Sequence, residues 1–557
     1  MEAISVIGFA IALFIFFIFK LLITPSKPKK NQLPEPWRIP IIGHMHHLIG
    51  TIPHRGVTEL ARKYGPLMHL QLGEVSTIVV SSPRWAKEIL TTHDITFADR
   101  PETLTGEIVG YHNTDIVFAP YGEYWRQLRK ICTLELLNTK KVKSFQTLRN
   151  EECWSTVNEI KALGSGKPID LSKCISKLIA RIISRATFGK GIKEERVFTE
   201  TVREAIELTG GFDDIADIFP SKKFLHHLSG KRAKLTKIQK KLDKVIDNII
   251  SNHSGSRSSS SRECLLDVLL RHKDEAELPL TSDNVKAVIF DMFAAGTDTS
   301  SVVIEWAISE LIRCPRVMKE LQAKLREAVK GKERIEEEDI QDLINYEVTP
   351  PLPLLMPREC REPCEINGYN IANKTKLLVN VFGINRDPEY WKDPESFIPE
   401  RFENSPINIM GSEYEYLPFG GGRRMCPGAS MGLANVELPL ANLLYYFDWK
   451  LPNGTSHDEL DMTELFGAVA QRKTKLVLVP MFQDIMDGSG LGSNKNPATW
   501  ELPSRIDNWL ICCYYFDWKL PNDSKGEDLD MVEVFGASVQ RKNELHMVLE
   551  PYRFSQN

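Results

Sequence analysis

The feature that most constrains this chain is a single cysteine in a glycine-rich loop, Pro-Phe-Gly-Gly-Gly-Arg-Arg-Met-Cys-Pro-Gly, over residues 418–428. A helical pattern follows the loop from Ala429 to Tyr446. Glycines let backbone N–H groups approach the sulfur closely, and such hydrogen bonds tune a thiolate-bound metal. An arginine near the cysteine favours the thiolate and can pair with a carboxylate of a bound group. The loop therefore favours a thiolate ligand of haem iron.

Two other interpretations of this loop are open. A single cysteine can be a small buried hydrophobe. A glycine run before arginines can bind phosphate, but the Gly-Lys-Ser/Thr ending of a P-loop is missing. The order Phe-x-x-Gly-x-Arg-x-Cys-x-Gly resembles the haem-ligand signature of the cytochrome P450 monooxygenases. The resemblance implies that Cys426 is the axial iron ligand, and that the haem site is shaped by Phe419, Gly422, Arg424 and Gly428.

Composition limits the remaining possibilities. The 557 residues carry a formal net charge of only −4, which does not suggest a nucleic-acid partner. Ten cysteines lack the paired spacing of a zinc site, so a reduced, cytosol-facing compartment fits better than a disulfide framework. A chain of this length could hold three or four average domains, although large α-rich enzymes often use it for one.

The N-terminal segment predicts a membrane anchor. Residues 4–23 are almost wholly apolar, and about 20 such residues can span a bilayer. A cleaved signal peptide is the alternative, although the run is long for one. Lysines follow the run and none precedes it, so the positive-inside rule places the rest of the chain in the cytosol. We predict a single-pass anchor over residues 1–24 and a basic, proline-rich hinge over residues 25–43, and the hinge is similar to that of P450s of the endoplasmic reticulum membrane.

A basic segment carries a second motif of the family. Trp125 and Arg129 are four residues apart and share one face of a predicted helix. A basic amphipathic surface helix would have the same spacing. The segment resembles a family helix whose Trp-x-x-x-Arg pair holds the haem propionates, and the resemblance adds Arg358 and Arg424 to this set. The basic face would also suit an acidic electron donor.

The identity of that donor follows from the resemblance. It implies that NADPH–cytochrome P450 reductase, a separate membrane-bound flavoprotein, supplies the electrons. The chain has no Gly-x-Gly-x-x-Gly dinucleotide fingerprint, in agreement with NADPH acting only indirectly.

A long apolar helix is predicted over residues 284–312, and a small-residue segment, Ala-Ala-Gly-Thr-Asp-Thr-Ser, interrupts it at residues 294–300. Small residues let another group approach the backbone, and a threonine hydroxyl can open the local hydrogen-bond ladder. A helix-packing notch would have this composition too. The segment resembles the oxygen-activating segment of the family, which implies that Asp298 and Thr299 relay protons during oxygen activation.

The amino-acid sequence lacks one element that the resemblance leads us to expect. A helix with Glu-x-x-Arg should precede the proline-rich strand at residues 350–358, and its charges should pair with the arginine of Pro-Glu-Arg-Phe, here residues 399–402. Residues 342–350 leave no room for that helix. We therefore expect Arg401 to lose its partner, and an unpaired buried charge costs about 3–5 kcal/mol. The departure makes a catalytically dead or misfolded relative, from a truncated allele or a fused gene model, the alternative to a working enzyme.

The C-terminal part contains an internal repeat. Tyr-Tyr-Phe-Asp-Trp-Lys-Leu-Pro-Asn at residues 445–453 recurs at residues 514–522, and three shorter segments recur at the same offset. Two copies do not make a solenoid. We predict a haem-thiolate monooxygenase domain over residues 44–482, a linker over residues 483–508 and a partial duplicate of the C-terminal β-region over residues 509–557.

The resemblance to the cytochrome P450 monooxygenases implies their fold, which is mainly α with a smaller β region, behind the predicted transmembrane anchor. The predicted reaction inserts one oxygen atom from O2 into a small apolar substrate. Residues 212–221 resemble plant microsomal members that oxidise sesquiterpene hydrocarbons. Family positions imply an apolar substrate pocket formed by Val117, Ala294, Ala295, Leu354, Leu355 and Val469.

Overall fold

In the computed structural model, the described residues form two units, divided between Gly488 and Ser489. In the first unit they are residues 31–191, 195–208, 215–222, 224–225, 229–254, 263–275, 280–330, 332–340, 350–402, 405, 407, 413–465 and 467–482. In the second unit they are four short strands within residues 516–551. The predicted anchor at residues 1–24 and the predicted linker at residues 483–508 lie outside the described residues.

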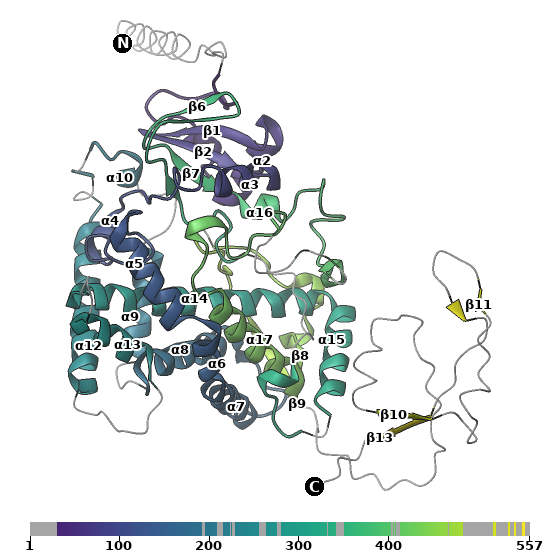
Figure 1. The fold of residues 1–557 in the computed structure, drawn as a ribbon. Coiled ribbons are helices and arrows are strands. Elements are labelled where there is room, and N and C mark those ends of the chain that lie inside the picture. The colour runs from purple at the N-terminus through teal and green to yellow at the C-terminus, as the bar shows by residue number, and fades with distance from the viewer. Residues whose placement is uncertain are drawn as a thin grey trace, which may run out of the picture. The chain divides into compact units, whose positions relative to one another are not determined.

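A long central helix, α14 (Ser282–Arg313), organises the helical part of the first unit (Figure 1). It begins at a capping box in which Thr281 and Asn284 satisfy each other's backbone N–H groups, and it ends where Pro315 starts the next helix. Its partners α8 (Leu171–Phe188) and α17 (Ala429–Tyr446) pack against it. One apolar core joins these three helices to the surrounding ones.

The remaining helices lie around this centre or pack against the larger sheet (Figure 1). Their bounds are α2 (Pro53–Tyr64), α3 (Pro83–Thr91), α4 (Leu104–Ile108), α5 (Glu123–Ile131), α6 (Thr139–Ser144), α7 (Gln146–Leu163), α9 (Glu195–Glu207), α10 (Ile215–Ile218), α12 (Lys231–Ser254), α13 (Leu265–Glu275), α15 (Pro315–Ala328) and α16 (Val381–Ile384).

Within the described part of the chain, α14 is the one helix long and apolar enough to cross a membrane. However, 72% of its most apolar window is buried inside the protein. It is therefore the core helix of the fold.

The larger sheet has the strand order β1-β2-β7-β4. Strands β1 (Leu67–Leu72) and β2 (Val75–Val80) form a tight antiparallel hairpin of β-branched and apolar residues. Strand β7 (Lys376–Val379) runs parallel to β2 and antiparallel to the two-residue strand β4 (Arg358–Glu359). The sheet thereby brings Arg358 next to the end of α3 and the cysteine loop. A separate hairpin joins β5 (Cys364–Ile366) to β6 (Tyr369–Ile371).

A three-stranded sheet closes the first unit, with the order β3-β9-β8. Its strands are β3 (Ile169–Asp170), β8 (Phe447–Lys450) and β9 (Val477–Phe482). Between β8 and β9 the chain returns to α14, where Trp306 Nε1 donates a hydrogen bond to the Ala470 carbonyl (2.6 Å). The same segment reaches α2, because Glu464 accepts hydrogen bonds from Arg55 (2.6 Å) and lies 2.7 Å from His54.

The second unit repeats this strand pairing. Strand β10 (Phe516–Lys519) pairs with β13 (Val548–Pro551) in the register of β8 with β9, so that Lys519 faces Val548 as Lys450 faces Val479. The short strands β11 (Glu533–Val534) and β12 (Gln540–Arg541) likewise pair Glu533 with Arg541, as Glu464 pairs with Arg472 in the first copy. The repeated sequence therefore carries the pairing pattern with it.

The region of the missing Glu-x-x-Arg helix is only partly described. After α15 the chain forms a short 3-10 turn at Glu337–Asp339, and residues 341–349, where that helix should lie, are outside the described residues. The guanidinium of Arg401 donates hydrogen bonds to the carbonyls of Asp393 (3.1 Å), Ser396 (2.7 Å) and Ile398 (3.2 Å). Backbone carbonyls thus provide partners for the arginine that we expected to lose its family-specific one.

Candidate active site

The cysteine loop is a tight, glycine-dependent turn that leads into α17. Gly420 (φ 70°) and Gly422 (φ 64°) adopt left-handed backbone conformations that other residues rarely take. A Cβ atom at Gly422 would lie 2.5 Å from Asp94 Oδ1 and 2.7 Å from the Leu90 carbonyl oxygen, so only glycine fits. The Cys426 N–H donates a hydrogen bond to the Phe419 carbonyl (3.0 Å), which fixes the cysteine against the start of the loop.

Cys426 lies shortly before the start of α17. The residue has accessible surface, although protein surrounds its sulfur. Burial raises the pKa of the Cys426 thiol, while a backbone hydrogen bond from Gly428 and the charge of Arg129 act in the opposite direction. A cation bound at this sulfur would complete the conversion to a thiolate, because a coordinating thiol is deprotonated outright.

Helix α5 places the predicted pair Trp125 and Arg129 on the same side of the site. Trp125 is buried, and its indole N–H donates to the Ile116 carbonyl (3.1 Å). The Arg129 guanidinium carbon lies 5.9 Å from the Trp125 ring centre. The guanidinium of Arg424 lies on the same ring at 4.2 Å, so one tryptophan orients two arginines.

Arg424 and Arg358 are held in place by backbone oxygens and one carboxylate. Arg424 donates to the carbonyls of Ala98 (2.7 Å) and Ala119 (2.6 Å). Arg358 donates to Asp94 Oδ1 (3.0 Å) and to the Gly421 carbonyl (2.5 Å). Arg424 Nη1 is buried and has no hydrogen-bond partner among the described residues.

These arginines form an electropositive cluster together with Arg100, which the sequence did not single out. Burial, followed by repulsion from Arg358, lowers the pKa of Arg424 to about 9. Burial also lowers the pKa of Arg100, and the charges of Arg424 and Arg358 add to the effect. A cluster with excess positive charge and an unused buried donor is suited to a ligand that brings carboxylates.

Helix α14 carries the other predicted site residues. Its surface is mostly buried, yet Ala295 is exposed in the middle of the helix and Thr299 follows one turn later. Thr299 Oγ1 donates a hydrogen bond to the Ala295 carbonyl (2.6 Å), one turn earlier in the helix. Burial raises the pKa of Asp298, so its carboxyl is prepared to hold a proton.

Gln471 is a residue of this site that the sequence did not reveal. Its Nε2 donates to Asp298 Oδ2 (2.9 Å) from the segment between β8 and β9. The adjacent Arg472 donates a hydrogen bond to Ser309 Oγ (2.8 Å), which lies nearer the C-terminal end of α14. The C-terminal segment therefore positions the acid of the central helix. A single glutamine distant in sequence carries no motif that could have identified it.

Two buried carboxyls, also missed from the sequence, hold the loop before α5. Asp291 Oδ2 accepts hydrogen bonds from the N–H groups of Ile116 (2.9 Å) and Val117 (3.3 Å). Asp115 Oδ1 accepts from the Phe118 N–H (2.7 Å). Burial raises the pKa of both carboxyls, and the proximity of Asp115 adds to the effect at Asp291. The pair is therefore expected to retain a proton near neutral pH.

This arrangement yields a prediction for Asp291. We expect Asp291→Asn to be tolerated, because an amide oxygen can accept the same two N–H groups. Asp291→Ala should lower the free energy of unfolding by about 3 kcal/mol, since two buried donors lose their acceptor. Because the folded state holds the extra proton, stability of the natural chain should fall as pH rises above the ordinary carboxyl pKa, and less steeply in Asp291→Asn.

Thermal unfolding between pH 5 and 8 measures these effects. A Thr114→Ala variant, in the same loop, serves as a matched control for substitution in that region. If Asp291→Asn were as unstable as Asp291→Ala, the ionised carboxylate would be the form that the loop requires.

Only two of the predicted substrate-pocket residues line a common cavity. A cavity of about 160 Å³ is lined by Leu354 and Leu355, by the end of β1 and by part of the loop before α5. Its walls are mostly apolar, with Arg100 and Lys376 among the few charged side chains. The other predicted pocket residues, Val117, Ala294, Ala295 and Val469, are not among the residues that line this cavity.

Val117 nevertheless lies close to that cavity. Its carbonyl accepts a hydrogen bond from Arg100 Nε (3.0 Å), whose Nη1 also donates to the carbonyls of Met356 (2.6 Å) and Pro357 (2.8 Å). Arg100 thereby joins the loop before α5 to the segment that carries Leu354 and Leu355.

The residues present fit a haem group. Cys426, a residue with accessible surface, lies at the turn into α17. Helix α14 carries a small-residue segment in which Ala295 is exposed, and the arginine cluster includes a buried donor without a partner among the described residues. The fold and the site therefore define a haem-thiolate oxidoreductase.

Comparison with known proteins agrees with this class. The family model for cytochrome P450 matches residues 33–479. A germacrene A hydroxylase from Barnadesia spinosa is 73% identical over 488 residues, covering 86% of this chain and 98% of that protein. An amorpha-4,11-diene 12-monooxygenase from Artemisia annua is 69% identical over 481 residues, covering 85% and 97%. A zebrafish cytochrome P450 solved with progesterone shares the fold at a TM-score of 0.65, with 24% identity over 77% of this chain and 99% of that one.

The chain belongs to the cytochrome P450 family. The predictions of a mainly α fold with a smaller β region, of haem as the cofactor and of a monooxygenase are confirmed. The roles of individual residues stay predictions.

Proposed function

We propose that the chain hydroxylates a sesquiterpene hydrocarbon. The observation that carries this proposal is the identity of about 70% to enzymes named for germacrene A and amorpha-4,11-diene, over nearly their whole length. A mostly apolar cavity lined by Leu354 and Leu355 supports it, because such a substrate offers no polar group to bind. The same relatives favour a working enzyme over the alternative of a catalytically dead or misfolded chain.

The haem would be held by the cysteine loop and the arginine cluster. Cys426 would be the axial ligand, with Phe419, Gly422 and Gly428 shaping the loop around its sulfur. Trp125, Arg129, Arg358 and Arg424 would bind the propionates, and this would give the buried Nη1 of Arg424 a partner. Depending on the position of the propionate, Arg358 would either keep its hydrogen bond to Asp94 or replace it with one to the propionate.

Proton delivery would be the task of α14. When bound, haem supplies the oxidation of a C–H bond with O2 and two electrons. The Asp298 carboxyl would hold a proton at Oδ1 or Oδ2 while Gln471 fixes its orientation. Thr299 would pass a proton at Oγ1, after its hydroxyl turns from the Ala295 carbonyl toward the site. The apolar walls would exclude water from the substrate side.

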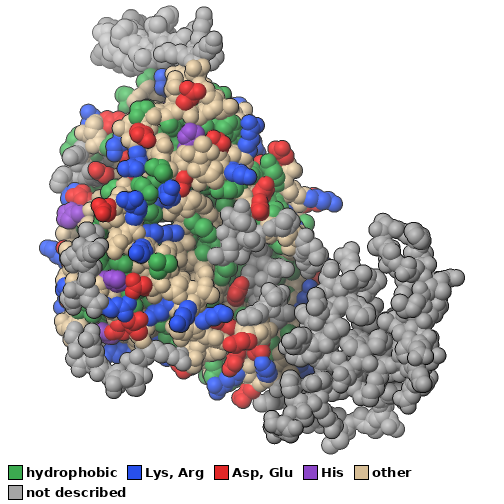
Figure 2. All heavy atoms as spheres, viewed as in Figure 1, with side chains coloured by type: hydrophobic (Ala, Val, Ile, Leu, Met, Phe, Trp, Pro, Cys, Tyr) green, Lys and Arg blue, Asp and Glu red, His purple; other side chains and the backbone are tan. Residues whose placement is uncertain are grey.

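The proposal also includes an electron donor and a membrane anchor, which involve parts of the chain outside the site described above. Figure 2 shows Lys and Arg side chains gathered over the face formed by α5 and α6, whose exposed basic residues are Arg126, Lys130, Lys140 and Lys143. We propose that this face binds NADPH–cytochrome P450 reductase, the indirect source of NADPH electrons. We further propose residues 1–24 as a single-pass anchor in the endoplasmic reticulum membrane, with residues 44–482 as the cytosolic domain and residues 509–557 as a partial duplicate.

The test is a paired spectrum and product assay on membranes from cells expressing this chain with a plant reductase. We expect a red-shifted reduced carbon-monoxide band and an NADPH-dependent product one oxygen heavier than germacrene A or amorpha-4,11-diene. A normal red-shifted band without product from either hydrocarbon would contradict the substrate class. Absence of the band would instead show that the haem site fails, as the dead-relative alternative predicts.

A further inference from the structure

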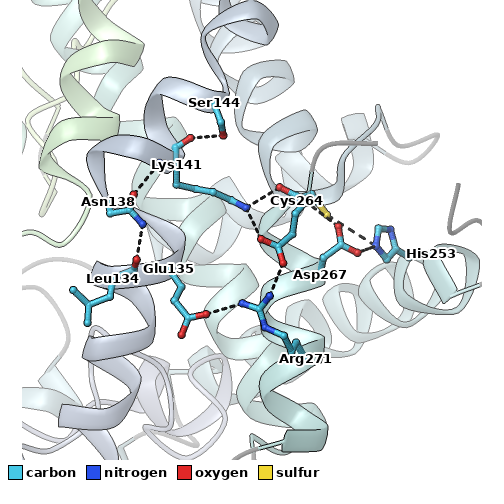
Figure 3. Close-up of polar contacts among 10 residues, drawn as sticks. Leu134, Glu135, Asn138, Lys141, Ser144, His253, Cys264, Asp267 and Arg271 are labelled. Atoms are coloured by element: carbon cyan, nitrogen blue, oxygen red, sulfur yellow. Dashed lines mark hydrogen bonds and ion pairs between the residues drawn. The ribbon is translucent and has the colours of Figure 1, made fainter. Parts of the chain in front are cut away.

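A second group of metal-ligand side chains lies apart from the haem site, where α12 ends and α13 begins (Figure 3). It consists of His253, Cys264 and Asp267, whose possible ligand atoms all lie within 4.8 Å of one another. His253 Nε2 is 2.7 Å from Asp267 Oδ1 and 4.0 Å from Cys264 Sγ. The Cys-x-x-Asp spacing and the distant histidine form no recognisable motif, so only the fold brings them together.

Each of the three side chains is fixed by its surroundings. Asp267 Oδ2 accepts the Cys264 N–H (2.9 Å), which holds the carboxylate at the start of α13. Cys264 is 2% exposed. Its thiol packs beside Gly189 at the end of α8, where a Cβ atom would lie 3.7 Å from the sulfur. His253 belongs to the last turn of α12 and is half-buried. The cluster therefore has a closed side formed by α8 and a more open side at the histidine.

Neighbouring charges are already paired and do not neutralise the cluster. Lys141 contacts the Glu263 carboxylate (3.0 Å), and Arg271 contacts both Glu263 (2.7 Å) and Glu135 (2.7 Å). Figure 3 shows this ion-pair network beside Cys264 and Asp267. The carboxylate of Asp267 and a thiolate at Cys264 thus stay available to balance a divalent cation.

We propose that His253, Cys264 and Asp267 bind one Zn²⁺ ion, with water as the fourth ligand. A thiolate, an imidazole and a carboxylate are the ligand types that zinc takes in a tetrahedral site. Calcium and magnesium prefer oxygen ligands only, so they do not suit this set. On binding, the Cys264 thiol loses its proton to solvent and the sulfur bonds to zinc. The proton that His253 Nε2 shares with Asp267 leaves for solvent, while Nδ1 carries the remaining proton of the neutral imidazole, so that Nε2 and the Asp267 carboxylate both bind the metal.

The rearrangement required is small. Zinc bonds of about 2.0 Å to nitrogen and oxygen and 2.3 Å to sulfur place tetrahedral ligand atoms about 3.3 to 3.6 Å apart. The 2.7 Å separation of His253 Nε2 from Asp267 Oδ1 must widen, and the 4.0 Å separation from Cys264 Sγ must shorten. Both changes are below about 1 Å and are within the reach of side-chain rotation at a half-buried histidine.

The ion would join the end of α12 to the start of α13. Helix α12 also carries Asp243, which accepts a hydrogen bond from the Tyr111 hydroxyl (2.6 Å) in the loop before α5. Lys286 of α14 lies 3.2 Å from the same carboxylate. Bound zinc would therefore stabilise a helix that supports the loop carrying the predicted pocket residue Val117, although the ion itself takes no part in the reaction.

Equilibrium dialysis of the purified haem protein against zinc, followed by elemental analysis, tests the proposal. We expect one zinc per chain in the natural protein and in Cys174→Ser, a matched cysteine variant on α8. Cys264→Ser and His253→Gln should weaken zinc binding at least tenfold, with an unchanged carbon-monoxide spectrum as the folding control. Equal zinc binding by both variants and the natural chain would show that the ion is adventitious and would overturn the site.

X-ray absorption at the zinc edge gives a second, variant-free measurement that the haem iron does not disturb. We expect one sulfur neighbour at about 2.3 Å and nitrogen or oxygen neighbours at about 2.0 Å. A shell without sulfur would exclude Cys264 as a ligand and contradict the proposal. If Cys264→Ser does not fold, zinc binding by His253→Gln, at the open side of the cluster, tests the site instead, and an unchanged zinc affinity of that variant would contradict it.

Discussion

Cys426→Ser should abolish both the red-shifted carbon-monoxide band and all hydroxylated product. A serine hydroxyl keeps the hydrogen bond from its backbone N–H to the Phe419 carbonyl, but its oxygen is a poor replacement for a thiolate. The thiolate's electron donation is what favours O–O cleavage in this class of haem enzyme. Turnover should fall below detection, the largest effect of any single substitution in the chain.

The experiment needs a control for general damage to the fold. Cys314→Ser, at the C-terminal end of α14, changes another cysteine without touching the cysteine loop, and it should keep the band and the activity. A Cys426→Ser protein that still gave the red-shifted band would show that another group ligates the iron.

Asp298→Asn should lower product formation by about 10²-fold while NADPH consumption continues. The amide keeps the hydrogen bond with Gln471 in a flipped orientation, yet it cannot hold and release a proton. Reduced oxygen that does not receive a proton from Asp298 for O–O cleavage is released as hydrogen peroxide, with its two protons taken from water, so the ratio of product to NADPH consumed should fall more than the rate of electron uptake. Product analysis together with NADPH absorbance measures both quantities.

The role of Gln471 can be separated from that of the acid. Gln471→Leu should reduce product by about tenfold, because the carboxyl remains but is no longer oriented. In the double variant the Gln471→Leu change should add little to Asp298→Asn, as expected for residues that act as a unit. Fully additive effects would show that Gln471 acts elsewhere. An Asp298→Asn enzyme with unchanged coupling would remove the carboxyl from proton delivery.

The features predictable from the sequence are those encoded in contiguous residues. The cysteine loop, the Trp125–Arg129 pair and the small-residue segment of α14 each lie within a single turn or helix, so each could be found as a short motif. The roles of these residues and the mainly α fold were predicted from the resemblance that the motifs carry, because their spacing alone left other interpretations open. Strand pairing in the second copy followed the first because the same residues recur.

The features that the sequence concealed are contacts between distant segments. Gln471 donates a hydrogen bond to Asp298, which lies far before it in the sequence. Asp291 of α14 accepts one from Ile116 in the loop before α5, and Arg100 donates one to the Pro357 carbonyl. None of these residues belongs to a motif, and a lone aspartate in an apolar helix has many explanations. His253 and Cys264 also belong to no motif, because the ten cysteines do not have the sequence spacing of a metal site. Tertiary packing, which local patterns do not encode, brings these residues together.

The position of Gln471 has a consequence for how the protein is made. A ribosome synthesises α14, and even Cys426, well before it reaches the segment that contacts Asp298, Trp306 and Ser309. Glu464 of that segment also joins it to His54 and Arg55, more than 400 residues earlier in the chain. A nascent polypeptide that stalls shortly after the cysteine loop thus contains every signature of the family but lacks the last contacts that complete its catalytic centre. Completion of the enzyme is a late event in translation, and a premature stop codon in this short stretch should be as harmful as one upstream of the haem ligand.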